Sequence, residues 1–190
     1  MGTSIFLIGG SAGSITVLLQ VLPAIDADIT FPIVVILHRK AHPKSALNNL
    51  LDASTSVPVE EIDDKMELKN GRIYLAPADY HLLFEEKRTV SLDVSEKINY
   101  SRPSIDVSFQ SAARMYEEEV AALLLSGGNH DGVEGLVSIA QHQGRTLVQD
   151  PATAEVEYMP RQAVEILPDA VLLRPEQMAA YINQMKSTYN

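Results

Sequence analysis

Short apolar runs alternate along this chain with segments whose apolar residues recur every three or four positions. Runs of four to six apolar residues are typical of buried strands, and the longer spacing is typical of helices that pack on one face. The alternation predicts an α/β fold, a doubly wound, mostly parallel sheet with helices on both faces. The six predicted strands span residues 4–8, 33–37, 57–61, 120–125, 146–149 and 170–173.

The helical spacing predicts six helices, and a change of period predicts an insertion. We expect helices over residues 15–22, 45–51, 105–116, 133–142, 161–166 and 175–186. Between residues 71 and 94 the apolar period falls to two, which indicates an inserted antiparallel β-hairpin region with strands at 73–75, 81–84 and 90–94. Ligands of open parallel sheets bind beyond the carboxyl ends of the strands, so the loops there are the first place to look for chemistry.

Composition narrows the class of protein. With 190 residues, 46% of them hydrophobic, residues 1–190 are predicted to form one domain. A net charge of -10 argues against binding to nucleic acids or acidic membranes, and it would repel an acidic partner unless a local basic patch reverses the sign. The chain has no cysteine, which excludes disulfides, thiolate metal sites and a cysteine nucleophile.

No targeting or membrane segment is evident in the sequence. Residues 1–25 lack the features of a secretory signal, and no apolar run approaches 18 residues. We therefore expect a cytoplasmic protein without membrane insertion.

A glycine-rich turn presents the first candidate for chemistry. Residues 7–14 read Leu-Ile-Gly-Gly-Ser-Ala-Gly-Ser, and Gly9, Ser11 and Gly13 fit the G-x-S-x-G nucleophile elbow. The following helix would direct unpaired N–H groups and its positive dipole end at this turn. Such turns also bind phosphate or nothing, but neither a dinucleotide fingerprint nor a P-loop can be read here, and the next strand ends in His38 rather than in an acid.

A serine nucleophile needs a base, and His38 and Asp131 are the candidates. A histidine can accept the serine proton near neutral pH, and an aspartate can orient the imidazole. Each residue could instead have a purely structural role: His38 as a hydrogen-bonded histidine, and Asp131 as a turn or helix-cap residue. His130 is a rival base. His38 and His42 are four residues apart, but Pro43 follows and no HExxH pattern is present, so we predict no metal site.

The order of several motifs resembles that of a known family, the catalytic domain of the chemotaxis receptor methylesterase CheB. The Ser11 turn resembles the family's nucleophile turn, His38-Arg39 stands in place of its His-Met, and residues 126–132 match its Thr-Gly-Met-Gly-x-Asp-Gly loop. Further matches follow in the same order over nearly the whole chain: Gly71-Arg-Ile-Tyr-Leu-Ala-Pro77, His81, Arg102-Pro-Ser-Ile-Asp106, Gln149-Asp150 and Met159-Pro160.

The resemblance implies a protein-glutamate methylesterase that hydrolyses γ-glutamyl methyl esters on the cytoplasmic helices of methylated chemoreceptors, with glutamine deamidation in some members. By position, Ser11 is the nucleophile, His38 the base and Asp131 the orienting carboxylate, with no cofactor. In the family a receiver domain precedes the catalytic domain. This chain begins at the first catalytic strand, so we expect no control by phosphorylation in cis, and a receiver or methyltransferase would be a partner in trans.

The chain departs from the family pattern around the expected site. Ala12 and Gly128 replace a threonine and a methionine, and Tyr158 replaces a glycine. These departures leave two alternatives open: an esterase or amidase with another substrate, and a catalytically degenerate module that binds a receptor or methyltransferase. The residues expected to line the site or hold the oxyanion are Ala12, Gly127, Gly128 and Asn129, and those expected on the substrate side are His130, Tyr158 and Met159.

Overall fold

The computed structural model describes residues 2–40 and 46–185. Its centre is a seven-stranded sheet in the order β3-β4-β2-β1-β7-β8-β9, in which all neighbouring strands are parallel. The strands are β1 (Ile5–Gly10), β2 (Ile33–Leu37), β3 (Val59–Glu61), β4 (Ile73–Leu75), β7 (Val120–Leu124), β8 (Arg145–Gln149) and β9 (Val171–Leu173).

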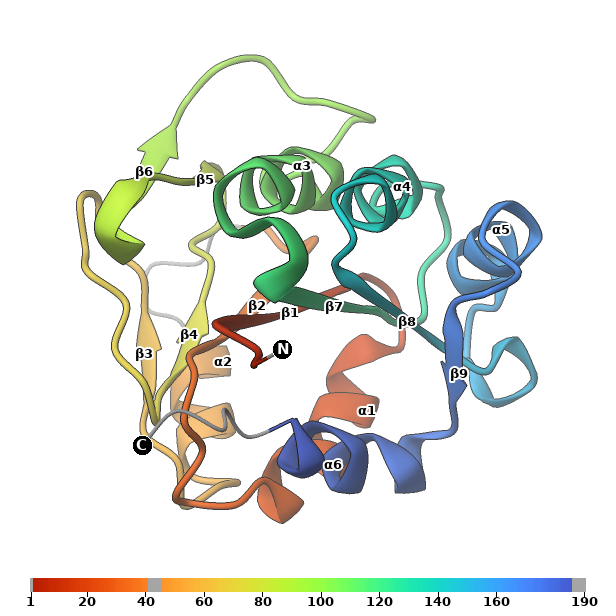
Figure 1. Cartoon of the computed structure of the whole chain (residues 1–190), viewed down its shortest axis with the longest axis horizontal. Helices are drawn as coiled ribbons and strands as arrows, with labels where there is room; N and C mark the ends of the chain where they lie inside the picture. Colours follow the sequence, from red (N-terminus) through yellow and green to blue (C-terminus); the bar gives the residue numbers. More distant parts are fainter. Residues whose placement is uncertain (1, 41–45, 186–190) are drawn as a thin grey trace.

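Helices cover both faces of the sheet (Figure 1). One layer holds α1 (Ser14–Val21), α2 (Ala46–Asp52) and α6 (Pro175–Gln184), and the other holds α3 (Ile105–Tyr116), α4 (Val133–Gln141) and α5 (Tyr158–Ile166). Alternate side chains of a strand point to opposite faces. In β1, Phe6 and Ile8 therefore pack in the core with α1 and α6, while Ile5 and Leu7 pack with α3 and α4.

The predicted doubly wound architecture is confirmed, with one error in the insertion. Residues 73–75 form β4, a parallel strand of the main sheet between β3 and β2, and not part of an antiparallel region. All three of its residues are buried, as in strands covered on both faces. The two antiparallel strands of this region are β5 (His81–Phe84) and β6 (Val90–Asp93), and β5 packs beside α3.

The remaining elements are short 3-10 helices. The 3-10 helices are η1 (Leu22–Ala24), η2 (Glu86–Arg88), η3 (Glu117–Glu119) and η4 (Pro151–Thr153). The predicted helix ends at residues 45 and 186, like His42, lie outside the described residues. None of the helices in the described ranges has the length and apolar character needed to cross a membrane.

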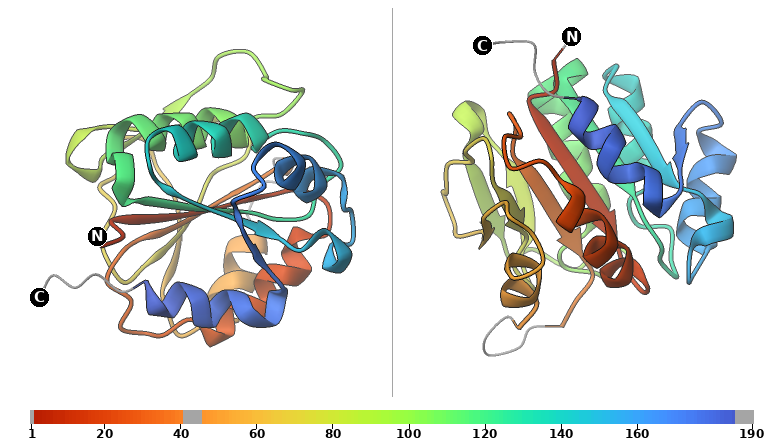
Figure 2. Two further views of the ribbon diagram at one scale, coloured as in Figure 1. Left: turned by 45° about the vertical axis from the view of Figure 1, so that its right-hand side comes forward. Right: turned by 90° about the horizontal axis from the view of Figure 1, so that it is seen from below.

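The strand order brings three loops to one edge of the sheet. Because β1 lies between β2 and β7 and all three run in parallel, their carboxyl ends are neighbours (Figure 2). Ser11 follows β1, His38 follows β2, and the loop that leads to Asp131 follows β7. The winding of the chain thus gathers the three candidate residues at one place, where open α/β sheets bind their ligands.

Close packing of α3 against β1 requires Gly9. A Cβ atom at Gly9 would lie 2.5 Å from Cγ2 of Ile105 and 2.9 Å from Cζ of Phe109. We expect Gly9→Ala to lower the free energy of unfolding by about 1–3 kcal/mol, the usual cost of overpacking. At Gly128 the nearest atom would be 3.8 Å away, so Gly128→Ala should change stability by less than about 0.5 kcal/mol. Urea unfolding of both variants tests this, and equal stabilities would contradict it.

Candidate active site

The turn after β1 holds Ser11 at the start of α1. The backbone N–H of Ser11 donates to the carbonyl of Ser126 at 2.9 Å, and the Ser11 carbonyl accepts from the N–H of Ser14 at 3.1 Å. Gly13 precedes α1 with φ of 82°, a left-handed conformation that glycine adopts without strain. Both bonds use backbone atoms, so neither occupies the Ser11 hydroxyl, and the residue is partly exposed.

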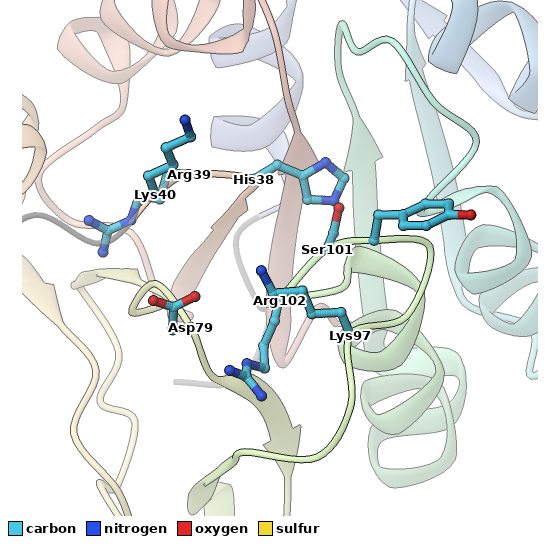
Figure 3. Close-up of a pocket in the computed structure, with 8 residues that line it drawn as sticks. His38, Arg39, Lys40, Asp79, Lys97, Ser101 and Arg102 are labelled. Carbon is cyan, nitrogen blue, oxygen red and sulfur yellow. The ribbon is translucent and has the colours of Figure 1, made fainter.

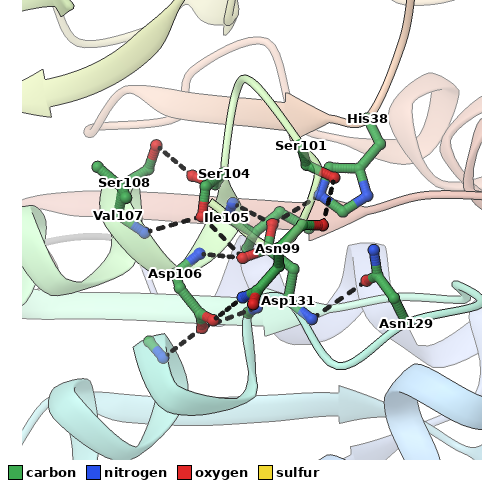
Figure 4. Close-up of polar contacts among 12 residues, drawn as sticks. His38, Asn99, Ser101, Ser104, Ile105, Asp106, Val107, Ser108, Asn129 and Asp131 are labelled. Carbon is green, nitrogen blue, oxygen red and sulfur yellow. Dashed lines mark hydrogen bonds and ion pairs between the residues drawn. The ribbon is translucent and has the colours of Figure 1, made fainter. Parts of the chain in front are cut away.

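His38 and Asp131 form a close pair beside this turn. The backbone N–H of His38 donates to the Gly10 carbonyl at 3.2 Å, which ties the end of β2 to the end of β1. Its Nε2 lies 2.6 Å from Oδ2 of Asp131 (Figure 4). An ionised carboxylate only accepts hydrogen bonds, so Nε2 carries the proton and Nδ1 is left with a lone pair. The His38 ring, 12% exposed, is therefore held in the tautomer that a base requires.

Asp131 is fully buried and saturated with hydrogen bonds. Besides His38, it accepts from Oγ of Ser104 at 2.7 Å, from the N–H of Ile105 at 2.7 Å and from the N–H of Asp106 at 3.1 Å. Burial alone would raise the pKa of Asp131, but the hydrogen bonds from His38, Ile105 and Ser104 outweigh it and lower that pKa. Asp131 is consequently a carboxylate at neutral pH.

Asp106 makes the reciprocal contact. Its Oδ1 accepts from the backbone N–H groups of Gly132 and Gly135, at 2.8 and 2.7 Å, in the first turn of α4, and Oδ2 accepts from the Asn99 side chain at 3.2 Å. Asp131 lies just before α4 and binds the start of α3, so each helix N-terminus is capped by the aspartate of the other. Burial is the main cause that raises the pKa of Asp106 to about 6, and the nearby charge of Asp131 adds to it.

Ser126, which the sequence analysis did not single out, joins three loops of the site. Its carbonyl accepts from Ser11, its N–H donates to Oε1 of Gln149 at 2.9 Å, and its hydroxyl donates to the Ala12 carbonyl at 2.7 Å. The same hydroxyl accepts from the N–H of Val156 at 2.9 Å. A small hydroxyl residue directly after a buried strand was the only sequence signal for this role.

The residues expected to hold an oxyanion differ in whether their backbone N–H is already used in a hydrogen bond. Gly127 does not fit the expectation, because its N–H already donates to the Val156 carbonyl at 3.0 Å. Ala12 and Gly128 are exposed, and among the described residues no hydrogen bond uses their N–H groups. Asn129 is half-buried, and its Oδ1 accepts from the N–H of Asp131 at 3.1 Å, which fixes the turn before α4.

The residues expected on the substrate side also divide. His130 is exposed and Tyr158 is 47% exposed, and both line a hollow of about 380 Å³ together with Tyr100. No hydrogen bond links His130 to the described residues of the Ser11 turn. Met159 is fully buried, and its Cε lies 2.4 Å from the place where Gly127 would carry a Cβ. Met159 therefore packs under the loop that contains Gly127, on its buried side, and does not face a substrate.

The raised pKa of Asp106 predicts a pH dependence of stability. In the unfolded chain the carboxyl titrates near 3.8, so its contribution to stability is present at low pH and is lost as pH rises from about 4 to about 6. Asp106→Asn removes this titration. Relative to the unmodified protein, the variant should gain up to roughly 3 kcal/mol of unfolding free energy between pH 4 and 7.

Urea unfolding across this pH range measures the difference between the two proteins. Ser56→Ala, at an exposed position, is the control: neither side chain titrates in this range, so its difference should not change with pH. A pH-independent difference for Asp106→Asn as well would contradict the prediction.

Comparison with known proteins shows the family of the chain. Residues 6–182 match the family described as CheB methylesterase. The crystal structure of the Thermotoga maritima CheB methylesterase catalytic domain superposes with a TM-score of 0.91 and 28% identity, over 97% of this chain and 100% of that one.

Two relatives differ in length. A protein of Leptospira interrogans, provisionally named a protein-glutamate methylesterase/protein-glutamine glutaminase, is 37% identical over 94% of this chain and 93% of its own length. The protein-glutamate methylesterase/protein-glutamine glutaminase of Thermotoga maritima is 32% identical over 85% of this chain, and the match spans 48% of that relative. With its family match, its fold and these relatives in agreement, the chain belongs to the CheB methylesterase family.

Proposed function

We propose that this protein is a serine carboxylesterase that hydrolyses γ-glutamyl methyl esters of chemoreceptor helices to glutamate and methanol. The observation that carries the proposal is the 2.6 Å contact of His38 with the buried Asp131, next to an open serine turn at the carboxyl edge of the sheet. The printed names of the relatives, protein-glutamate methylesterase/protein-glutamine glutaminase, support this substrate class.

The proposed reaction uses the Ser11 hydroxyl as nucleophile. His38 Nδ1 takes the hydroxyl proton as Oγ attacks the ester carbonyl, and Asp131 stabilises the imidazolium that forms. Collapse of the tetrahedral intermediate breaks the C–O bond to the methoxy group, which leaves as methanol with the proton from His38. Water, deprotonated by His38, then attacks the acyl-enzyme, and the second collapse returns the proton to Ser11 and frees the glutamate.

The negative oxygen of the tetrahedral intermediate needs hydrogen-bond donors. The residue after a nucleophile at an elbow commonly supplies one, and here that residue is Ala12, whose N–H is unused among the described residues. The N-terminus of α1 adds a positive dipole end at the same turn. The backbone N–H groups of Gly128 and Asn129 are the other donors we assign, because Gly127 uses its N–H within the protein.

The same chemistry extends to a glutamine side chain. Attack on the γ-amide gives the same acyl-enzyme, with ammonia leaving in place of methanol and His38 supplying the leaving-group proton. The relatives' names include this activity, and we propose it as a second reaction. A substrate on the cytoplasmic helices of receptors implies a cytoplasmic location, with a receiver or methyltransferase as partner in trans.

Ser11→Ala and His38→Ala test the assignment of nucleophile and base. Each should reduce methanol release from a methylated receptor fragment to near background, because the first removes the attacking oxygen and the second removes the proton acceptor. Ser56→Ala, at an exposed position away from the site, is the matched control and should retain full activity. Full activity of a correctly folded Ser11→Ala variant would refute the mechanism, and receptor binding without turnover in the unmodified protein would favour the degenerate binding module.

Asp131→Asn and Ser104→Ala separate orientation of the imidazole from capping of α3. Asp131→Asn should lower kcat by up to roughly 10⁴-fold, because an amide can donate to Nε2 and so selects the wrong tautomer. Ser104→Ala removes one hydrogen bond to Asp131 but leaves its contact with His38, so it should lower the melting temperature while retaining most of kcat. Equal kcat losses in the two variants would show that Asp131 acts only through the fold.

A further inference from the structure

A cationic hollow lies beside His38 in a protein whose net charge is -10. Its volume is about 320 Å³, and its cationic side chains are those of Arg39, Lys40, Lys97 and Arg102 (Figure 3). Asp79 is the one carboxylate among the described residues that line it. We call these four residues and the space between them the basic hollow. Its charge has the opposite sign to that of the molecule as a whole.

Much of this positive charge is not neutralised within the protein. Arg102 donates through Nη1 to the carbonyls of Val94 and Ser95, each at 2.8 Å, and these acceptors are neutral. Neither Arg102 nor the exposed Lys97 forms an ion pair with a carboxylate in the described ranges. Arg39 differs, because its Nη2 lies 2.5 Å from Glu61. After the hydrogen bonds from Ser95, the nearby charge of Arg102 contributes to lowering the pKa of the Asp93 carboxyl. Lys97 is therefore the cation of this loop that is most available to a ligand.

The basic hollow is fixed relative to the reacting groups. Its loop is tied to α3 by the hydrogen bond from Asn99 to Asp106, and it is closed by two mutual backbone bonds between Ile98 and Ser101. Figures 3 and 4 place Ser101 next to the ring of His38. Tyr100, 99% exposed, stands at the boundary between the basic hollow and the hollow lined by Tyr158. A segment whose ester reaches Ser11 would thus bring its neighbouring side chains over these two hollows.

We propose that the basic hollow binds a side-chain carboxylate of the substrate segment, on a residue that flanks the esterified glutamate. This inference rests on the proposed function and specifies its substrate: an acidic helical segment. The methyl ester itself is neutral, so the reacting group does not need a cationic lining. The cations instead favour a negatively charged residue next to the ester in the substrate. Arg39 occupies the position where the family pattern has methionine, which makes the charge of this hollow partly a property of this chain.

The basic hollow also changes the expected effect of salt. The net charge alone predicts that an acidic substrate associates faster as ionic strength rises, because salt screens repulsion. Contact with Lys97 and Lys40 is attractive and short-range, and salt weakens it. For an acidic segment we therefore expect kcat/KM to fall with ionic strength, opposite to the direction set by the whole molecule.

The test compares two helical peptides that carry one glutamate γ-methyl ester. In the first, the residues three and four positions on either side are Glu, which places them on the face of the ester, and in the second they are Ala. The unmodified protein should favour the acidic peptide by about three- to tenfold in kcat/KM, since each exposed ion pair contributes a factor of up to about five.

Lys40→Gln/Lys97→Gln is the decisive variant. It should lose most of this preference and of its salt dependence while hydrolysing the neutral peptide as the unmodified protein does. Lys69→Gln, an exposed lysine before β4 at the amino edge of the sheet, is the matched control and should keep both. Anisotropy of labelled peptides, with methionine in place of the esterified glutamate, measures binding independently of turnover, because methionine is neutral and has no carbonyl to attack.

The outcomes separate this inference from the proposed function. Hydrolysis of both peptides at equal kcat/KM, unchanged in the double variant, overturns the acidic-segment assignment and leaves the esterase intact. Selective binding of the acidic peptide without methanol release supports the basic hollow as a binding site and refutes the esterase. A preference for the acidic peptide that is undiminished in the double variant also overturns the assignment, because the two lysines of the basic hollow then contribute nothing to it.

Discussion

The exchange of two carboxylates between α3 and α4 is the interaction on which the site depends. Asp131 precedes α4 but accepts hydrogen bonds from the start of α3, and Asp106 lies in α3 but accepts from the start of α4. Helix N-termini favour negative charge, so each buried carboxylate is stabilised by the partner helix. Oδ2 of Asp131 accepts from Ile105 and also contacts His38, so the packing of two helices sets the position of the imidazole.

This exchange places two buried carboxylates close together and gives them different protonation behaviour. Hydrogen bonds lower the pKa of Asp131, whereas burial raises the pKa of Asp106 to about 6. Neighbouring acids whose environments separate their pKa values in this way can take different roles. Asp131, which faces His38, keeps its negative charge where an imidazolium forms during the proposed reaction. Asp106, which only connects the two helices, is the carboxyl that is more easily protonated.

The sequence predicted the parts of the fold that depend on local pattern. The strand-to-helix turn at Ser11 and the positions of His38 and Asp131 after buried strands follow from hydrophobic periodicity. The pairing of β4 did not follow, because a three-residue apolar run is compatible with a parallel or an antiparallel neighbour. The role of Asp106 was also missed, since its hydrogen bonds reach residues 26 and 29 positions away in the chain.

Differences from the family pattern fall mainly on solvent-accessible residues around the site. The residues that hold His38 in position are buried beneath them. Ala12, Arg39 and Tyr158 line the open edge or its hollows, whereas Asp131 and Ser104 are buried between helices. A change at a solvated loop alters the charge or shape offered to a ligand at little cost in packing, but a change beneath it would leave buried polar groups unpaired. Because the exposed residues that would contact a ligand are separate from the buried ones that support the site, this chain can alter what it binds while keeping the groups that would carry out the reaction.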